Sequence, residues 1–171
     1  MQTFLRALRL FAVVAWVGGL CFFAFAVAPV AFHRLSSTHE AGLVVGGTLR
    51  VLHWIGLVGG GVFFVATGLL WLRAELSARV GLVVQLVLTG LMLGVTAYSQ
   101  FSILPAMEVD RALAGGEVDT ASADNAGRVD FERLHDLSER LEGFVLFCGL
   151  GVVFMLARES RLPETGKIVG A

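Results

Sequence analysis

Four long apolar runs constrain this chain more than any other feature of its sequence. A helix that crosses the hydrocarbon core of a bilayer needs about 20 consecutive, mostly apolar residues. The runs cover about residues 8–32, 51–72, 80–101 and 137–157. The sequence therefore predicts an all-α polytopic membrane protein, built as a four-helix transmembrane bundle.

The composition agrees with a membrane-spanning bundle and argues against nucleic-acid binding. Of the 171 residues, 56% are hydrophobic and 16% are charged, whereas soluble domains have about 45–50% apolar and about 25% charged residues. The net charge of −1 and the lack of any run of four basic residues argue against nucleic acid as a partner, because its recognition needs a concentrated basic face. The length fits a single four-span domain over residues 1–157, followed by a polar tail at 158–171.

Two of the four helices are predicted to extend beyond the bilayer. Ser37 followed by Glu40 is a capping-box pattern, so a helix should begin near Thr38 and continue into the second span. An amphipathic stripe that begins near Ala123 leads into the fourth span without interruption. Both extensions are expected on the same side of the membrane.

Two prolines are expected to mark the limits of helices. A proline inside a helix removes a backbone hydrogen bond, and its ring clashes with the preceding turn. Pro29 should bend or end the first span, and Pro105 should stop or redirect the chain after the third. Residues 106–127 are then expected to form a water-facing loop with at most a short helix.

The distribution of basic residues favours a cytoplasmic position for both termini. With that orientation, seven Lys and Arg residues lie inside and six lie outside, four of the six on the long third connection. The short connection between Arg73 and Arg79 should weigh more in setting the orientation. We therefore expect the amino and carboxyl ends on the cytoplasmic side.

Small residues at helical spacing predict close packing between helices. Glycines one turn apart let two helix backbones approach closely in lipid. Such pairs occur in the second and third spans, and two adjacent glycines occur in the first. The predicted helix-packing residues are Gly18, Gly19, Gly56, Gly60, Gly90 and Gly94.

Four ionisable residues form the candidate site. Ionisable side chains at membrane depth are costly and mark functional sites by default, and His53 is the deepest of them. His135, Glu139 and Glu142 follow an i, i+4, i+7 spacing, which places them along one face of a helix. Imidazole and carboxylate groups can bind a divalent metal or relay protons, and a histidine can bind haem.

Structural explanations for the same residues stay open. His53 can be an interfacial histidine, hydrogen-bonded to a neighbouring helix beside Trp54. The helix face that carries His135, Glu139 and Glu142 can be a salt-bridged surface, because Arg133 and Arg140 are close to them in sequence. All four histidines nevertheless fall on the side expected to be outside, and a site is therefore expected there.

Three segments of the chain carry a family resemblance. They are AWVGGLCFFAFAVAPVAF, ILPAMEVDR and FERLHDLSERLEGFVLFCGLGVV, in that order. Together they resemble a bacterial family of unknown function related to eukaryotic transmembrane protein 205, over about residues 5–157. The resemblance implies four transmembrane helices in a bacterial inner membrane and an uncharacterised activity. Its pattern falls on Trp16, Gly18, Gly19, Pro29, Pro105, Arg111, His135, Ser138 and Gly143. Where the family often has Asn before that last glycine, this chain has Glu142.

Association ranks first among the functions that the sequence supports. The small-residue faces and the lack of a recognised catalytic motif favour a subunit or partner in a membrane complex, or a homo-oligomer, over an enzyme. A metal- or haem-handling protein is the alternative, with His33 and His39 as entry ligands. A small oligomeric transporter is a further alternative. The lipid bilayer is a partner in every case.

Overall fold

The computed structural model describes residues 1–159, which form four long helices and no strand. The first helix consists of α1 (Gln2–Phe22), the π-helical segment η1 (Phe23–Val27) and α2 (Ala28–Arg34). The second is α3 (Thr38–Trp71). The third consists of α4 (Leu76–Tyr98), the π-helical segment η2 (Ser99–Ile103) and α5 (Leu104–Leu113). A 3-10 turn, η3 (Val118–Thr120), precedes the fourth helix, α6 (Ala126–Glu159). Most of the predicted polar tail, from residue 160 onward, lies outside the described residues.

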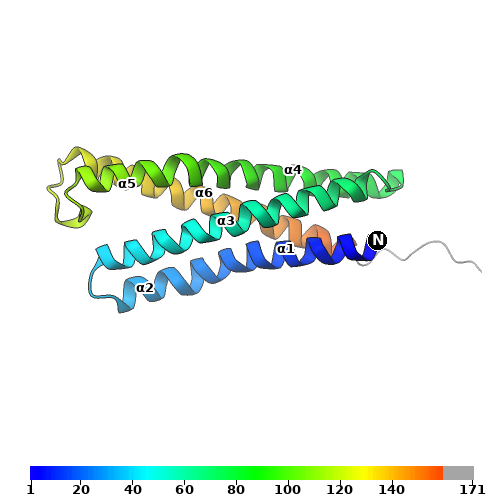
Figure 1. Cartoon of the computed structure of the whole chain (residues 1–171), viewed down its shortest axis with the longest axis horizontal. Coiled ribbons are helices and arrows are strands. Elements are labelled where there is room, and N and C mark those ends of the chain that lie inside the picture. Colours follow the sequence, from blue (N-terminus) through cyan, green and yellow to red (C-terminus); the bar gives the residue numbers. More distant parts are fainter. Residues whose placement is uncertain (160–171) are drawn as a thin grey trace, which may run out of the picture.

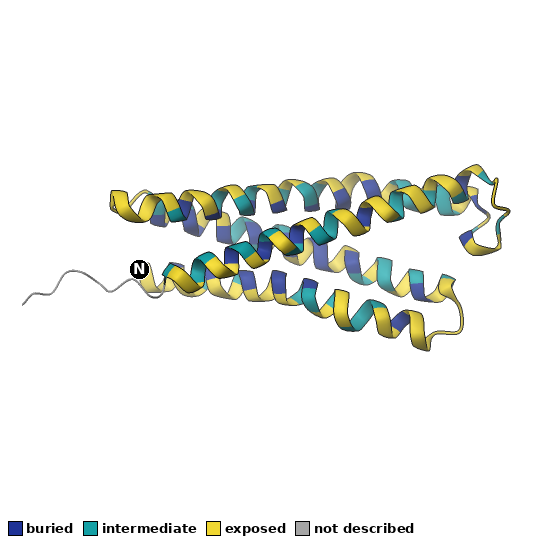
Figure 2. Ribbon diagram, turned by 180° about the vertical axis from the view of Figure 1, so that it is seen from behind, coloured by how far each residue is buried: buried dark blue, intermediate teal, exposed yellow. Residues whose placement is uncertain are grey.

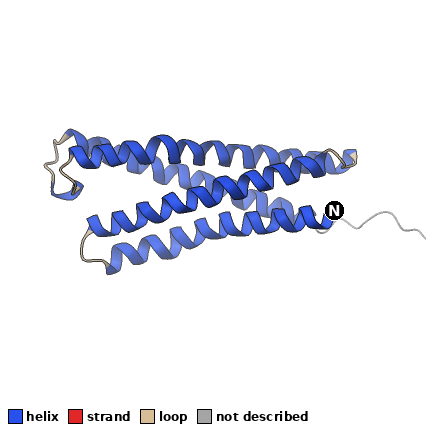
Figure 3. Ribbon diagram, in the orientation of Figure 1, coloured by secondary structure: helices blue, strands red, loops and turns tan. Residues whose placement is uncertain are grey.

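The four helices form an antiparallel bundle (Figure 1). α1 packs along α3, α3 along α4, and α4 along α6, while α6 also contacts α1. At one end, α2 packs on α3 and α5 packs on α6, and these two pairs diverge (Figure 1). The predicted all-α bundle of four helices is confirmed (Figure 3).

All four helices are longer than a bilayer requires. They contain 33 to 38 residues each and are apolar enough to cross a membrane. At about 1.5 Å per residue, even the shortest is about 50 Å long, compared with about 30 Å for the hydrocarbon core. The extension predicted for two helices is therefore shared by all four.

Exposed residues cover the outer side of each helix and buried ones face the other helices (Figure 2). Many of the exposed residues are apolar, whereas several of the buried ones are polar. Phe11, Phe25 and Phe147 expose 74%, 77% and 76% of their surface. Arg9 and His53, in contrast, are 0% and 1% exposed. A surface this rich in exposed aromatic and aliphatic side chains is stable in contact with lipid rather than water. The chain is accordingly a membrane protein.

Trp16 occupies the centre of the apolar core and fixes the packing of α1 on α3. Its side chain is 3% exposed. A Cβ atom added at Gly56 or Gly60 would lie 2.3 Å from the indole ring, which is closer than van der Waals contact permits. These two glycines of α3 therefore accommodate a tryptophan of the same chain.

The other glycines predicted to pack have more varied surroundings. A Cβ at Gly19 would lie 2.7 Å from Leu52, so the first and second helices also approach closely there. A Cβ at Gly90 would make an ordinary 3.6 Å contact with Phe64. Around Gly18 and Gly94 there is no atom within 4 Å of such a Cβ.

Neither Pro29 nor Pro105 ends its helix, so of the expected effects, bending or ending for Pro29 and stopping or redirecting for Pro105, the ending and the stop are wrong. Each lies near the start of a new α-helical segment that directly follows a five-residue π-helical segment. A proline ring clashes with the carbonyl group four residues earlier, which here belongs to Phe25 or Phe101. The wider π turn around these residues removes that clash, so both helices continue. The predicted loop at 106–127 consequently begins only after Leu113.

Polar side chains cap the starts of α3 and α6, as predicted for α3. The Ser37 hydroxyl accepts a hydrogen bond from the Glu40 amide at 3.1 Å, and the Glu40 carboxylate accepts one from the Ser36 amide at 3.3 Å. The Asn125 side chain accepts a bond from the Arg128 amide at 3.0 Å, so α6 starts slightly later than Ala123.

Candidate functional site

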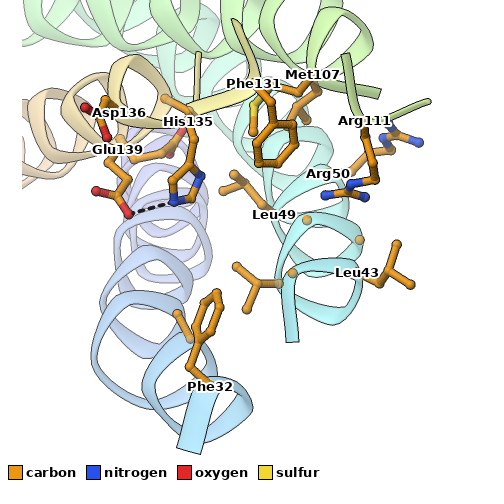
Figure 4. A pocket seen from close by; sticks show the side chains of 18 of the residues that line it. Phe32, Leu43, Leu49, Arg50, Met107, Arg111, Phe131, His135, Asp136 and Glu139 are labelled. Carbon is orange, nitrogen blue, oxygen red and sulfur yellow. Dashed lines mark ion pairs between the residues drawn. The ribbon is translucent and has the colours of Figure 1, made fainter. Parts of the chain in front are cut away.

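A large pocket lies where the α2–α3 pair diverges from the α5–α6 pair. Its volume is about 890 Å³. All four long helices contribute to its lining, and Figure 4 shows many of the side chains that surround it. The pocket therefore results from the bundle's shape at this end, rather than from a gap beside one helix.

One side of the pocket is apolar throughout. The first helix contributes only aliphatic and aromatic lining residues, namely Leu20, Phe23, Ala24, Ala28 and Phe32. Leu49 of α3 and Phe131 of α6 continue this surface, and their side chains lie near each other in Figure 4.

The charged residues of the remaining lining are mostly acidic. Six carboxylates line the pocket, compared with two arginines and two histidines. Arg50 of α3 is paired with Glu108 of α5 at 2.6 Å, and Arg111 lies over the ring of Phe131, 5.2 Å from its centroid. Arg50 and Arg111 lie on one side of the pocket, and Asp136 and Glu139 of α6 lie on the other (Figure 4).

At the inner end of the pocket, Glu142 of α6 contacts His53 of α3. One carboxylate oxygen, Oε1, lies 2.7 Å from His53 Nε2, and His53 Nδ1 lies 3.1 Å from the amide oxygen of Gln100 in η2. The His53 side chain is 1% exposed and that of Glu142 is 14% exposed. The second carboxylate oxygen, Oε2, is buried and has no hydrogen-bond partner within the described residues.

Both ring nitrogens of His53 therefore have a polar partner, Nδ1 in Gln100 of η2 and Nε2 in Glu142 of α6. The imidazole of α3 thus connects the second, third and fourth helices at this level of the bundle.

A second buried polar cluster lies toward the opposite end of the bundle. The Arg9 guanidinium of α1 donates to both oxygens of Glu159 in α6, at 3.3 and 3.1 Å, and also to the Gln85 amide oxygen of α4. Gln85 donates in turn to Glu159 at 3.4 Å. Arg9 also lies over the ring of Phe63, 5.1 Å from its centroid. These hydrogen bonds join α1, α4 and α6.

The four residues predicted as metal ligands form two pairs rather than one cluster. His53 contacts Glu142 at 2.7 Å, and His135 contacts Glu139 at 3.2 Å at the more exposed part of the pocket. Within residues 1–159, no group of three or more His, Cys, Asp or Glu side chains is placed to hold a metal ion. Of the two further histidines, His39 lines the pocket.

Sequence reasoning missed the partners of the predicted residues. Gln100 contacts His53 and Arg9 contacts Glu159, and neither Gln100 nor Arg9 was singled out from the sequence. A signal for both was present on the third helix. Its buried polar residues recur at helical spacing and indicate an inward-facing polar stripe: Gln85, Thr89, Thr96, Ser99 and Gln100.

Comparison with known proteins yields one match. A family model described as a domain of unknown function (DUF4149) matches residues 11–110. The matched segment includes His53 and Gln100 but ends before α6 and Glu142. No curated protein and no solved structure matches the chain.

Proposed function

Because the chain belongs to the DUF4149 family, whose description names no activity, we propose from the pocket itself that this membrane protein binds a small amphiphilic molecule. The molecule's apolar part would lie against the first helix and its polar head would face α6. The single observation that carries this proposal is the pocket of about 890 Å³ with one apolar and one acidic side.

The size and lining of the pocket support a ligand site. Pockets that bind small molecules usually measure about 300–1,000 Å³ and combine apolar walls with a few polar groups. The residues around Leu20 and Phe32 supply an apolar wall, and the buried His53–Glu142 pair supplies a polar inner end. A buried carboxylate oxygen without a partner is costly, so a ligand that donates to it gains affinity.

The orientation in the membrane belongs to the same proposal. The amino terminus, the connection between α3 and α4, and the end of α6 lie at one end of the bundle (Figure 1). That end carries Arg6, Arg73, Arg79 and Arg158, which favours the cytoplasmic side. The pocket would then open on the outer side of a bacterial inner membrane. The relation to transmembrane protein 205 is likewise part of the proposal and rests on the sequence resemblance.

A cysteine placed in the pocket tests the proposal. Gly46 lines the pocket, and a Cβ added there meets no atom within 4 Å, so G46C should fold. In a C21A/C148A background in lipid nanodiscs, we expect decylamine, decanol or decanoate to slow maleimide labelling of the G46C thiol at least threefold. S77C, at an exposed position in the first turn of α4 at the other end of the bundle, is the matched control and should label at an unchanged rate.

Two outcomes would count against this proposal. If none of the three decyl compounds slows labelling of G46C, the pocket does not bind amphiphiles. If all of them slow G46C and S77C equally, the effect comes from the bilayer. In intact cells, a membrane-impermeant maleimide should label G46C and spare S77C; the reverse pattern would overturn the orientation.

Association with another membrane protein, or with a second copy of the chain, is a second candidate function. Gly18 and Gly94 are exposed, and an added Cβ at either has no neighbour within 4 Å, which leaves room for a partner helix. Small residues on a lipid-facing surface are typical of such interfaces. A native mass equal to the 18.3 kDa of one chain, with no co-purifying protein, would refute it.

A further inference from the structure

The length of the pocket's apolar wall and the arginine at its outer part define the ligand more narrowly. Resting on the proposed function, we infer that the ligand is a phospholipid of the surrounding membrane. One acyl chain lies in the pocket along the first helix, and the phosphate contacts Arg111. The juxtaposition that carries this inference is an apolar wall about one leaflet long beside an arginine that has no carboxylate partner within the described residues.

The first helix is apolar on both of its sides where it lines the pocket. From Leu20 to Phe32 all its side chains are hydrocarbon except that of Cys21. The outer side exposes 66% of Phe22 and 77% of Phe25, whereas the inner side lines the pocket. A helix that is apolar all round is stable in apolar surroundings on every side, and water against such a wall is unfavourable. The pocket side therefore requires an apolar occupant, as the outer side requires lipid.

The length of this wall matches one acyl chain. Leu20 and Phe32 are twelve residues apart, which corresponds to about 18 Å along a helix. The hydrocarbon core of about 30 Å consists of two leaflets, so one chain extends over about 15 Å. On α3, the apolar side chains of Leu43, Val45 and Leu49 line the pocket along the same stretch. A membrane acyl chain of ordinary length therefore fits along the wall.

Arg111 is placed to hold the phosphate group. Its guanidinium lies over the ring of Phe131 in α6, 5.2 Å from the centroid, and 3.9 Å from where a Cβ of Gly42 in α3 would be. Arg50 is paired with Glu108, whereas the side chain of Arg111 has no hydrogen bond or ion pair within residues 1–159. A guanidinium binds phosphate through two parallel hydrogen bonds. Arg111 therefore has this capacity unused.

Most carboxylates of the lining already have partners and do not compete for Arg111. Asp119 accepts a hydrogen bond from the Thr38 hydroxyl, and Asp136 lies across the pocket from Arg111 (Figure 4). The other four are in close pairs: Arg50–Glu108, Arg128–Glu132, His135–Glu139 and His53–Glu142. Acidic groups on the α6 side disfavour a lipid with a net negative charge, so the suitable probe is a zwitterionic phospholipid.

The shape of the pocket suits a lipid with two chains. The pocket opens to the outside of the bundle, where the α2–α3 and α5–α6 pairs diverge (Figure 1). One chain is then held in the pocket while the second remains in the bilayer. A phosphate on Arg111 lies next to the Phe131 ring of α6, which is the side where the proposed function places the polar head.

Photo-crosslinking with a whole phospholipid tests the inference. The probe is phosphatidylethanolamine with a diazirine at the end of one acyl chain, present as a minor component of phosphatidylcholine nanodiscs. The control probe is the corresponding diazirine fatty acid, which lacks the phosphate. We expect the phospholipid to label Leu20 and Leu146, at the inner end of the pocket, at least threefold more than the fatty acid does. Both probes should label the lipid-facing Phe147 equally.

Three variants test the role of Arg111. R111Q should lower labelling of the pocket by the phospholipid at least threefold, because a charge-assisted pair of hydrogen bonds is lost. R111K should retain part of the labelling, since an ammonium group binds phosphate without the bidentate geometry. R34Q is the matched control, because Arg34 is exposed at the same end of the bundle and does not line the pocket. Labelling of Phe147 should stay constant, and the unfolding temperature checks that each variant is folded.

The outcomes separate this inference from the proposed function. Equal pocket labelling by the two probes, or by the phospholipid in R111Q and the parent, overturns recognition of the phosphate. If the phospholipid labels only lipid-facing residues while decyl compounds still protect G46C, the phospholipid is wrong and the amphiphile pocket stands. If the decyl compounds fail to protect as well, the proposed function itself is overturned. The comparison of the two probes in the parent protein needs no variant.

Discussion

Arg9 illustrates what a buried charge requires at the scale of one residue. It is 0% exposed, yet its guanidinium has the Glu159 carboxylate, the Gln85 amide and the Phe63 ring around it. Burying a charge is tolerated when it is both paired and hydrogen-bonded. The cost of removing one partner is then much larger than the net stabilisation by the pair.

The high cost of removing one partner of a buried ion pair gives a prediction for the stability of the bundle. Removal of one partner from a fully buried ion pair costs about 3–5 kcal/mol. Glu159 is 27% exposed, so we expect E159Q to destabilise the bundle by less, about 2 kcal/mol. The double variant R9M/E159Q removes both charges and should be more stable than E159Q alone. Thermal unfolding in detergent measures the difference; a double variant no more stable than E159Q would contradict the importance of pairing.

The prolines show how one residue acts on a whole element. Pro105 follows the π-helical segment η2, and that segment contains Gln100, the partner of His53. A π turn holds more residues than an α turn, so it changes the direction of the side chains that it contains. The proline thus contributes to the geometry of the site without touching His53. Pro29 follows η1, whose five residues are all apolar.

Replacement of these prolines should therefore have different effects. P105A allows η2 to become regular α-helix, which would turn Gln100 away by roughly the 100° that separates successive residues of an α-helix. The hydrogen bond from His53 Nδ1 should weaken, and the ¹⁵N NMR signals of His53 should shift. P29A is the matched control and should leave those signals in place. An unchanged His53 spectrum in P105A would show that the proline does not maintain the π segment.

Sequence predicts the elements of this fold well because lipid imposes a simple requirement on them. A span has to be apolar and about 20 residues long, and runs such as 51–72 meet that requirement without reference to the rest of the chain. The continuation of helices past Pro29 and Pro105 was not predictable in this way. It depends on a local π turn, which no apolar pattern signals.

The candidate site was only partly predictable from the sequence, because its contacts depend on how the helices are rotated in the bundle. His53 and Glu142 stand out because they are ionisable within or beside apolar runs. They are 89 residues apart in the chain, and their contact depends on how α3 and α6 are rotated in the bundle. In a membrane helix the lipid-facing side is apolar too, so hydrophobic periodicity gives little information on that rotation. The His53–Glu142 and His135–Glu139 pairs therefore emerge only in three dimensions.

At the scale of the whole molecule, the bundle has two unlike ends. Toward the cytoplasmic end of the proposed orientation, Arg9, Gln85 and Glu159 tie three helices together. At the other end the α2–α3 and α5–α6 pairs diverge and enclose the pocket (Figure 1). A tightly joined end and an open end are what a binding protein needs, since the first maintains the fold while the second admits the ligand.

Photo-crosslinking is the most direct test of whether this pocket binds an amphiphile. Decylamine and decanol derivatives with a diazirine at the end of the chain would be irradiated with the protein in nanodiscs, and the adducts mapped by mass spectrometry. We expect adducts on pocket residues such as Phe23, Phe32 and Leu49, suppressed by an excess of the parent compound. Adducts confined to lipid-facing residues such as Phe11 and Phe147, and insensitive to that excess, would show that the pocket binds neither compound.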